Sequence, residues 1–338
     1  MTSTTPSTRR SANWAAKAIA LAGIVALSGC ATAADDALTP EGSAAPEGSA
    51  EQLSLTVANM PIADQGSYFY ALENGIFEEH NLAVTSAPAT GGSAAIAAMV
   101  AGDFDVVYSG ADGVIKAAAN GVPVRIISGA NVNQPEGEKD STGLVVAPGI
   151  GQLSDLAGAT IATNALGNIN QVFAQEYLAQ NGVDDVTVVE IPFPEQVAAL
   201  ESGTIKATLL PEPFASQAVA AGGSVLGFPY RIGEDQTTGV GVFVSTEQTI
   251  ADKSEAVTAF VDAMEQAAEE ANNSENRAAV VSAILANTKL ESEVANNMTF
   301  VHWTRDVTPA QIQAVADLLT KYGSLTTDVD VQKIFATS

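Results

Sequence analysis

One short phrase occurs twice in this chain and constrains its fold more than any other feature. Residues 97–108 read AAMVAGDFDVVY, and residues 198–209 read AALESGTIKATL. Each copy is typical of a helix that ends at a glycine and is followed by a strand. The flanks repeat as well, since YALENG at 70–75 corresponds to YLAQNG at 177–182. With strands before and after these helices, the pattern predicts an α/β fold of two similar lobes, each β-α-β-α-β.

Two similar α/β lobes normally hold a ligand between them, at the carboxyl ends of their strands. The length of 338 residues is sufficient for both. We expect residues 53–142 and 240–338 to form the first lobe and residues 143–239 the second. The crossings are expected near 143–147 and 240–245, which makes a hinge the natural moving part.

Hydrophobic patterning predicts the elements that frame this cleft. An amphipathic helix is expected at 67–79, with Ser67 as a candidate N-cap. The tail at 247–335 is predicted to be almost wholly helical, with a helix start at Thr308 and Pro309. Strands are expected at 53–58, 82–86, 104–108, 124–128, 160–163, 186–191, 207–210 and 240–245.

The charge of the chain is strongly negative. It contains 14 Lys and Arg against 39 Asp and Glu, a formal net charge of −25. Nucleic acid and anionic membrane surfaces are therefore excluded as partners for the body of the protein. The simplest role for so many acidic residues is to keep the surface soluble and to prevent nonspecific association with other molecules.

Cys30 is the only cysteine, which excludes an intramolecular disulfide and a cysteine metal site. It follows a basic segment with Arg9, Arg10 and Lys17 and a short apolar run at 18–27. LSGC at 27–30 resembles the lipobox of bacterial lipoproteins, which implies a signal peptide at 1–29 and acyl chains such as palmitate on Cys30. An uncleaved anchor helix is the alternative.

The export route stays open between two systems. TRRS at 8–11 resembles a twin-arginine signal, but ANW at 12–14 departs from that pattern, so ordinary secretion is favoured. Residues 30–52 are rich in Ala, Gly, Ser, Pro and acid and predict a disordered tether. The chain is thus expected on the outer face of a cell membrane, anchored by lipid.

Five motifs occur in this order: YALENGIF at 70–77, GDFDV at 102–106, GVPV at 121–124, LSDLAG at 153–158 and PEPF at 211–214. Together they resemble the solute-binding proteins of ABC importers, in the branch of nitrate, sulfonate, taurine and thiamine-pyrimidine binders. The resemblance covers nearly all of 53–335. LAGAT at 156–160 departs from it, because members commonly carry lysines there.

The resemblance implies a type II periplasmic-binding-protein fold and a small-molecule ligand that closes the cleft. It implies an ABC permease and its ATPase as partners, a monomer, and neither a catalytic group, a metal nor a cofactor. The ligand expected from it is a sulfonate, a taurine-like or a pyrimidine-like molecule.

Segments that leave the strand ends of the first lobe supply half of the candidate ligand-binding residues. Asp64 and Gln65 lie at a helix entrance, where Asp64 could bind an amine or hydroxyl or else cap the helix. Gly92 and Ser93 open a helix with bare backbone, as an anion nest or a tight turn. Tyr108 could stack on the ligand or belong to the core rim, with Ser109 as a donor beside it.

The second lobe supplies the matching segments. Asn164 and Asn168 precede a helix start, and Glu212 stands between two prolines before Phe214. Glu212 could bind a cationic group of the ligand or stabilise the N-terminus of the next helix. These segments contain no Arg or Lys, and Asp64 with Glu212 favours a neutral, zwitterionic or amine-bearing ligand.

Two other functions stay open at this stage. Pyrimidine synthases of thiamine biosynthesis share the fold, but they need a cytosolic address, histidine chemistry and a cysteine-rich segment. His80 and His302 lie outside the cleft segments, and no cysteine follows Cys30. A receptor for a membrane sensor, in place of a transporter, is not distinguished by the sequence.

Overall fold

The computed structural model describes residues 52–134, 139–231, 237–290 and 292–336. The expected signal peptide, Cys30 and the tether up to residue 51 lie outside the described residues. Among those described, no helix is long and apolar enough to cross a membrane.

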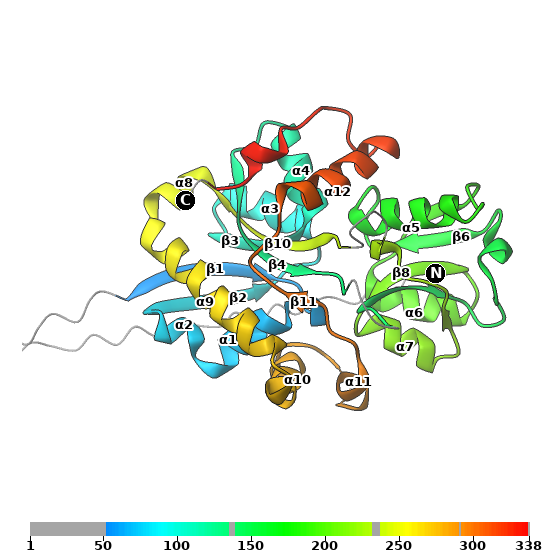
Figure 1. Ribbon diagram of the computed structural model, residues 1–338, viewed down its shortest axis with the longest axis horizontal. Helices are drawn as coiled ribbons and strands as arrows, with labels where there is room; N and C mark the ends of the chain where they lie inside the picture. Colours follow the sequence, from blue (N-terminus) through cyan, green and yellow to red (C-terminus); the bar gives the residue numbers. More distant parts are fainter. Residues whose placement is uncertain (1–51, 135–138, 232–236, 291, 337–338) are drawn as a thin grey trace, which may run out of the picture. The chain divides into compact units, whose positions relative to one another are not determined.

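Six described strands form the first sheet, in the order β11-β4-β10-β3-β1-β2 (Figure 1). β1 is parallel to β2 and β3, whereas β10 is antiparallel to β3 and β4. The strands are β1 (Leu53–Asn59), β2 (Leu82–Pro88), β3 (Val106–Gly110), β4 (Val124–Val132), β10 (Gly239–Thr246) and β11 (His302–Trp303).

The second sheet repeats this pattern with five described strands, in the order β7-β6-β8-β5-β9. β6 is parallel to β7 and β8, and β5 is antiparallel to β8. The two copies of the repeated phrase end in β3 and β8, which hold equivalent places in the sheets. The strands are β5 (Thr142–Val146), β6 (Thr160–Thr163), β7 (Thr187–Glu190), β8 (Ala207–Pro211) and β9 (Ser224–Val225).

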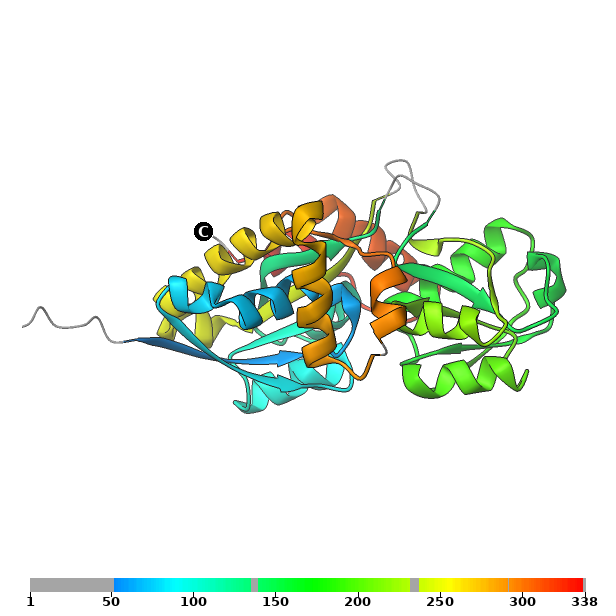
Figure 2. The same ribbon diagram turned by 90° about the horizontal axis from the view of Figure 1, so that it is seen from below.

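Helices cover both faces of the first sheet (Figures 1 and 2). Because side chains alternate along a strand, Val106 packs on one face and Val107 on the other. One face carries α1 (Gly66–Asn74), α2 (Ile76–Glu79), α9 (Ser254–Asn272) and α10 (Arg277–Asn287). The opposite face carries α3 (Gly92–Ala101), α4 (Ala111–Ala119) and α12 (Pro309–Lys321).

Three described helices belong to the part of the chain that forms the second sheet. They are α5 (Ile169–Gln180), α6 (Phe193–Glu201) and α7 (Phe214–Ala220). The remaining helices are α8 (Glu247–Asp252) and α11 (Ser292–Asn297). Single 3-10 turns are η1 (Ala63–Gln65), η2 (Leu153–Leu156), η3 (Pro229–Arg231), η4 (Ser274–Asn276) and η5 (Val331–Ile334).

The helix predicted at 67–79 is wrong in two respects. The 3-10 turn η1 precedes it and α1 begins at Gly66, so Ser67 lies inside the helix and not at its N-cap. Gly75 then ends α1 with a φ of 77°, and α2 starts after it. Glycine adopts this left-handed backbone without a side-chain clash, which is why the apolar pattern continues while the helix does not.

The crossings and the tail also differ from expectation. Residues 143–146 belong to β5 and residues 240–245 to β10, so the residues expected at the crossings are buried in strands of the two sheets. The tail is not wholly helical, because β11 pairs with β4 and Phe335 bridges to Ile126. The helix start at Thr308 is confirmed, with a capping box between Thr308 and Gln311.

Candidate functional site

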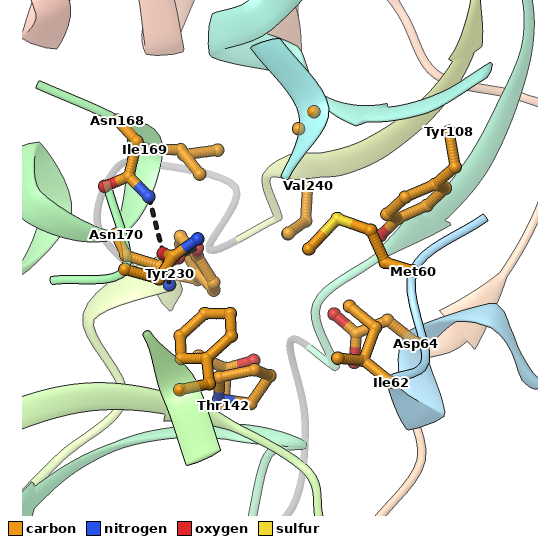
Figure 3. Close-up of a pocket in the computed structure, with 15 residues that line it drawn as sticks. Met60, Ile62, Asp64, Tyr108, Thr142, Asn168, Ile169, Asn170, Tyr230 and Val240 are labelled. Carbon is orange, nitrogen blue, oxygen red and sulfur yellow. Dashed lines mark hydrogen bonds between the residues drawn. The ribbon is translucent and has the colours of Figure 1, made fainter. Parts of the chain in front are cut away.

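A cavity of about 70 Å³ is lined by residues of both sheets and lies where β1, β3, β6 and β8 end (Figure 3). Ligand sites of α/β sheets occur at this edge, outside the carboxyl ends of the strands. At roughly 15 Å³ for one water, the volume accommodates a group of about five non-hydrogen atoms. Five of the predicted residues line it, namely Asp64, Gly92, Tyr108, Asn164 and Asn168.

Hydrogen bonds to its backbone hold Asp64 in place, and its side chain lines the cavity. Its carbonyl oxygen accepts hydrogen bonds from Trp303 Nε1 at 2.9 Å and from Asn131 Nδ2 at 3.2 Å. The side chain is buried, and Oδ1 finds no hydrogen-bond partner in the described part of the chain. Burial, reinforced by the charges of Asp140 and Glu212, raises the pKa of Asp64 to about 7.

Tyr108 lies beside Asp64 at the end of β3. Its hydroxyl accepts a hydrogen bond from Asn131 Nδ2 at 3.1 Å, and its ring packs edge-on against Phe243. Burial and the charge of Asp64 raise the pKa of Tyr108, so the hydroxyl stays neutral and can donate to a ligand. Gly241 makes room for it, since a Cβ there would lie 2.4 Å from the Tyr108 hydroxyl.

Gly92 brings α3 close to the end of β3. A Cβ on Gly92 would lie 2.3 Å from Ser109 Oγ, so only glycine fits this contact. Ser109 Oγ donates to the carbonyl of Gly110 at 2.8 Å and lies behind the cavity wall. Ser93 belongs to the first turn of α3 and, of the described side chains, is not among those that line the cavity.

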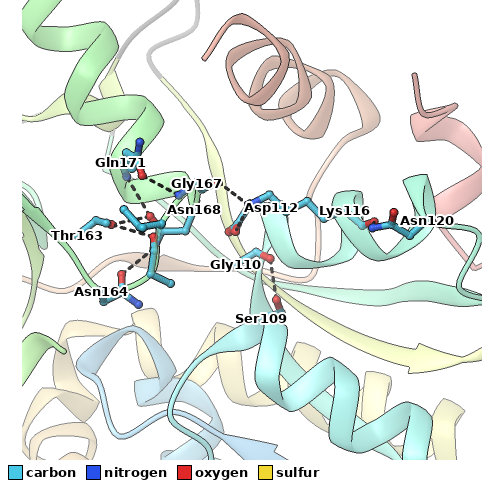
Figure 4. Close-up of polar contacts among 12 residues, drawn as sticks. Ser109, Gly110, Asp112, Lys116, Asn120, Thr163, Asn164, Gly167, Asn168 and Gln171 are labelled. Atoms are coloured by element: carbon cyan, nitrogen blue, oxygen red, sulfur yellow. Dashed lines mark hydrogen bonds and ion pairs between the residues drawn. The ribbon is translucent and has the colours of Figure 1, made fainter. Parts of the chain in front are cut away.

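Side-chain amides at the start of α5 form the opposite wall (Figure 4). Asn168 caps this helix, because its Oδ1 accepts from Gln171 N at 3.0 Å and from Thr163 Oγ1 at 2.7 Å. Its Nδ2 donates to Asn164 Oδ1 at 2.7 Å, and Asn170 Nδ2 donates to the same oxygen at 3.3 Å. The result is a polar wall whose amides hold one another in place.

Gln65, Glu212 and Phe214 lie outside the cavity lining, as far as the described residues define it. Gln65 Nε2 donates to the carbonyl of Met60 at 2.9 Å. The carboxylate of Glu212 accepts from Ser216 N at 3.1 Å and Ser216 Oγ at 2.7 Å, which stabilises the start of α7. Phe214 stacks on Phe193, which does line the cavity.

Sequence reasoning missed several lining residues. Asn170 follows the predicted Asn168 within the first turn of α5, so helix geometry could have suggested it. Tyr230 lies in η3, outside the repeated units, and donates a hydrogen bond to Asn170 Oδ1. No pattern in the sequence marks Tyr230.

Cations near the cavity already have partners. Among the described residues, none that lines the cavity is Arg or Lys. Lys116 pairs with Asp112 at 3.7 Å and donates to the carbonyl of Gly167, while Arg231 lies 3.3 Å from Asp140. The described side chains also contain no group of three or more His, Cys, Asp or Glu that could hold a metal ion.

Comparison with known families gives one match. The model of the NMT1-like family matches residues 48–285, which is more than half of the chain. No curated protein matches the chain.

Solved structures with the same fold are numerous. The alkanesulfonate-binding protein SsuA of Xanthomonas axonopodis pv. citri, bound to MOPS, has a TM-score of 0.70 at 19% identity, over 85% of this chain and 99% of its own. The nitrate-binding protein NrtA of Synechocystis PCC 6803 has a TM-score of 0.70 at 16% identity, over 84% and 85%. A Candida albicans gene product described as having the generic periplasmic binding protein fold has a TM-score of 0.63 at 16% identity, over 82% and 92%.

Proposed function

Because the chain belongs to the NMT1-like family and has the periplasmic binding protein fold, we propose that it binds a small organic solute and delivers it to an ABC importer. It is a binding protein and not an enzyme. The observation that carries the proposal is the cavity at the strand ends of both sheets, with Asp64 and Tyr108 on one side and Asn168 and Asn170 on the other (Figure 3).

Cleft closure is the mechanism that this arrangement supports. We propose that the first sheet with its helices forms one lobe and that the second sheet with α5, α6 and α7 forms the other. A ligand that contacts both walls binds the closed form more tightly than the open form, so it shifts the population toward closure. An importer then distinguishes the loaded protein by its closed shape.

The location follows from the first residues of the chain. Cleavage before Cys30 and acylation of its thiol would hold the protein on the outer face of the membrane, next to the permease and its ATPase. Two acyl chains anchor a protein stably, whereas one gives only reversible binding. The chain acts as a monomer, and a sulfonate, a taurine-like or a pyrimidine-like molecule remains in the range of solutes proposed from the family.

Native mass spectrometry and small-angle scattering together test this proposal. We expect the freshly purified mature protein to retain a small molecule that is released on unfolding. Adding that molecule back to the stripped protein should reduce the radius of gyration and raise the melting temperature, as mass action requires. A rise in melting temperature with no compaction would show that one lobe binds alone, which would contradict the closure mechanism.

A further inference from the structure

Among the described buried carboxylates near the cavity, Asp112, Asp140 and Glu212 have compensating partners. Asp140 faces Arg231 at 3.3 Å, and Asp112 faces Lys116 at 3.7 Å. Glu212 accepts two hydrogen bonds from Ser216. Asp64 is the exception, because its Oδ1 has no partner among the described residues although only 3% of the residue is exposed. Leaving such a charge unpaired in the interior is unfavourable, so the site is complete only with a partner.

Two amides near Asp64 are fixed by backbone carbonyls and bring it no cation. The Asn131 amide donates from Nδ2 to a backbone carbonyl, which can only accept, so its Oδ1 must face away as an acceptor. Gln65 is fixed in the same way by the carbonyl of Met60. Both amide oxygens are buried without a described partner, as is Asp64 Oδ1. Of these three residues, only Asp64 belongs to the described lining of the cavity, so it is the carboxylate of Asp64 that a donor from a ligand can satisfy.

The titratable groups that face Asp64 strengthen this conclusion. Asp140 and Glu212 add negative charge from the second sheet, and Tyr108 and Tyr230 are neutral phenols within reach of the charge on Asp64. Tyr230 and Phe193 line the cavity with aromatic rings, which attract cations at their faces. An anion in this cavity would meet the charge of Asp64 with no Arg or Lys among the described lining residues to offset it.

We propose that the ligand of this cavity carries a cationic nitrogen group, an ammonium or amidinium, whose N–H donors bind the carboxylate of Asp64; this inference rests on the proposed function. A metal ion is a poorer occupant, since no cluster of three metal-ligating side chains exists in the described chain. The cavity of about 70 Å³ fits the head group of such a ligand.

Binding of a cation should release a proton from Asp64. Burial raises the pKa of Asp64 to about 7, so below neutral pH the carboxyl group of the empty site is protonated. A cation can bind there only when this proton leaves. Affinity for a cation should thus rise about tenfold per pH unit from pH 5 to 7 and level off above. A ligand that accepts a hydrogen bond from protonated Asp64 would show the opposite dependence.

Probes that share an ethyl group and differ in the charge of the group attached to it test the proposal directly. Propionamidinium and propylammonium are cations, propionamide is neutral, and propionate and ethanesulfonate are anions. Thermal shifts and calorimetry at pH 6, 7 and 8, with each probe at up to about 10 mM, measure binding in the range of weak millimolar affinities. We expect a cation to stabilise the protein most, and Asp64→Asn to weaken its binding by about tenfold or more.

Asp105→Asn is the matched control. Asp105 pairs with Lys253 at 2.8 Å before β3, at the opposite end of that strand from the cavity, so its substitution should leave cation binding unchanged. The proposal is overturned if neither cation binds, if propionamide binds as tightly as propionamidinium, or if affinity falls as pH rises. Binding of propionate or ethanesulfonate with compaction, but of neither cation, would overturn this inference alone and leave the proposed function standing.

Discussion

Asp64 destabilises the protein in which it is buried, and this effect can be measured without knowing the ligand. Its pKa is raised from 3.8 to about 7, by burial first and then by Asp140 and Glu212. The folded chain therefore binds more protons than the unfolded chain between these values, and the contribution of Asp64 to stability falls as pH rises through this window. Above pH 7 the effect is on the order of 4 kcal/mol.

Asp64→Asn should accordingly make the ligand-free protein more stable at pH 8, by several degrees in melting temperature, and this gain should shrink at pH 5 or below. Thermal unfolding of both proteins at the two pH values checks it. A variant that is less stable than the parent at pH 8 would show that the carboxylate supports the fold, for example as a helix-capping group. Destabilising charge is common at binding sites, where function opposes stability.

The sequence predicted the positions of the site residues better than their roles. Asp64, Tyr108 and Asn168 follow directly from the repeat, because equivalent strand ends face the same cleft. Glu212 follows from the same logic, yet its side chain turns to Ser216. A strand end fixes where a backbone lies, whereas the rotamer depends on nearby donors, and no sequence period reports those. Tyr230 enters the site from outside the repeat, so the repeat could not predict it.

At the scale of elements, α5 links the amide wall of the cavity to the second sheet. Asn168 begins this helix as its N-cap and also donates to Asn164 Oδ1 at 2.7 Å. A lost N-cap typically costs about 1 kcal/mol of stability. Asn168→Ala should therefore lower the melting temperature and also weaken ligand binding, because both the cap and the amide contact are removed.

Asn168→Ser separates these two effects without adding charge to the cavity. Serine keeps a capping oxygen but lacks the amide that donates to Asn164, so stability should return while binding stays weak. Thermal unfolding and calorimetry with the retained ligand measure the two quantities. Full recovery of binding in Asn168→Ser would show that the amide wall has no part in recognition and that α5 contributes only structure.

Local patterns also misplaced some elements, for physical reasons. The apolar period continues from α1 into α2 because both pack under the same sheet face, and Gly75 separates them through its backbone alone. β11 is only two residues long, and it exists because the edge of β4 accepts it. Such a strand forms only because a partner far away in the sequence pairs with it. Tertiary pairing therefore determines that these two residues are a strand, and local propensity does not.

At the scale of the molecule, the tail of the chain joins α5 across the cleft. Lys321, the last residue of α12, lies 2.5 Å from Glu176 of α5, and the hydroxyl of Tyr322 donates to the same carboxylate at 2.8 Å. Lys116 adds a contact nearby by donating to the carbonyl of Gly167. These contacts stabilise the arrangement in which both cavity walls meet.

Glu176→Gln should weaken this link and shift the protein toward its open form. Lys321 is largely exposed, so the ion pair is worth no more than about 1 kcal/mol, and the expected loss of ligand affinity is about twofold to fivefold. Affinity falls because less of the protein is competent for binding, and not because a ligand contact is lost. The radius of gyration of the ligand-free variant should increase, whereas that of the saturated variant should match the parent. High salt should produce the same shift in the parent and little in the variant, since screening acts on the pair itself. Unchanged scattering of the ligand-free variant, at low and at high salt, would show that Glu176 serves only the stability of α5.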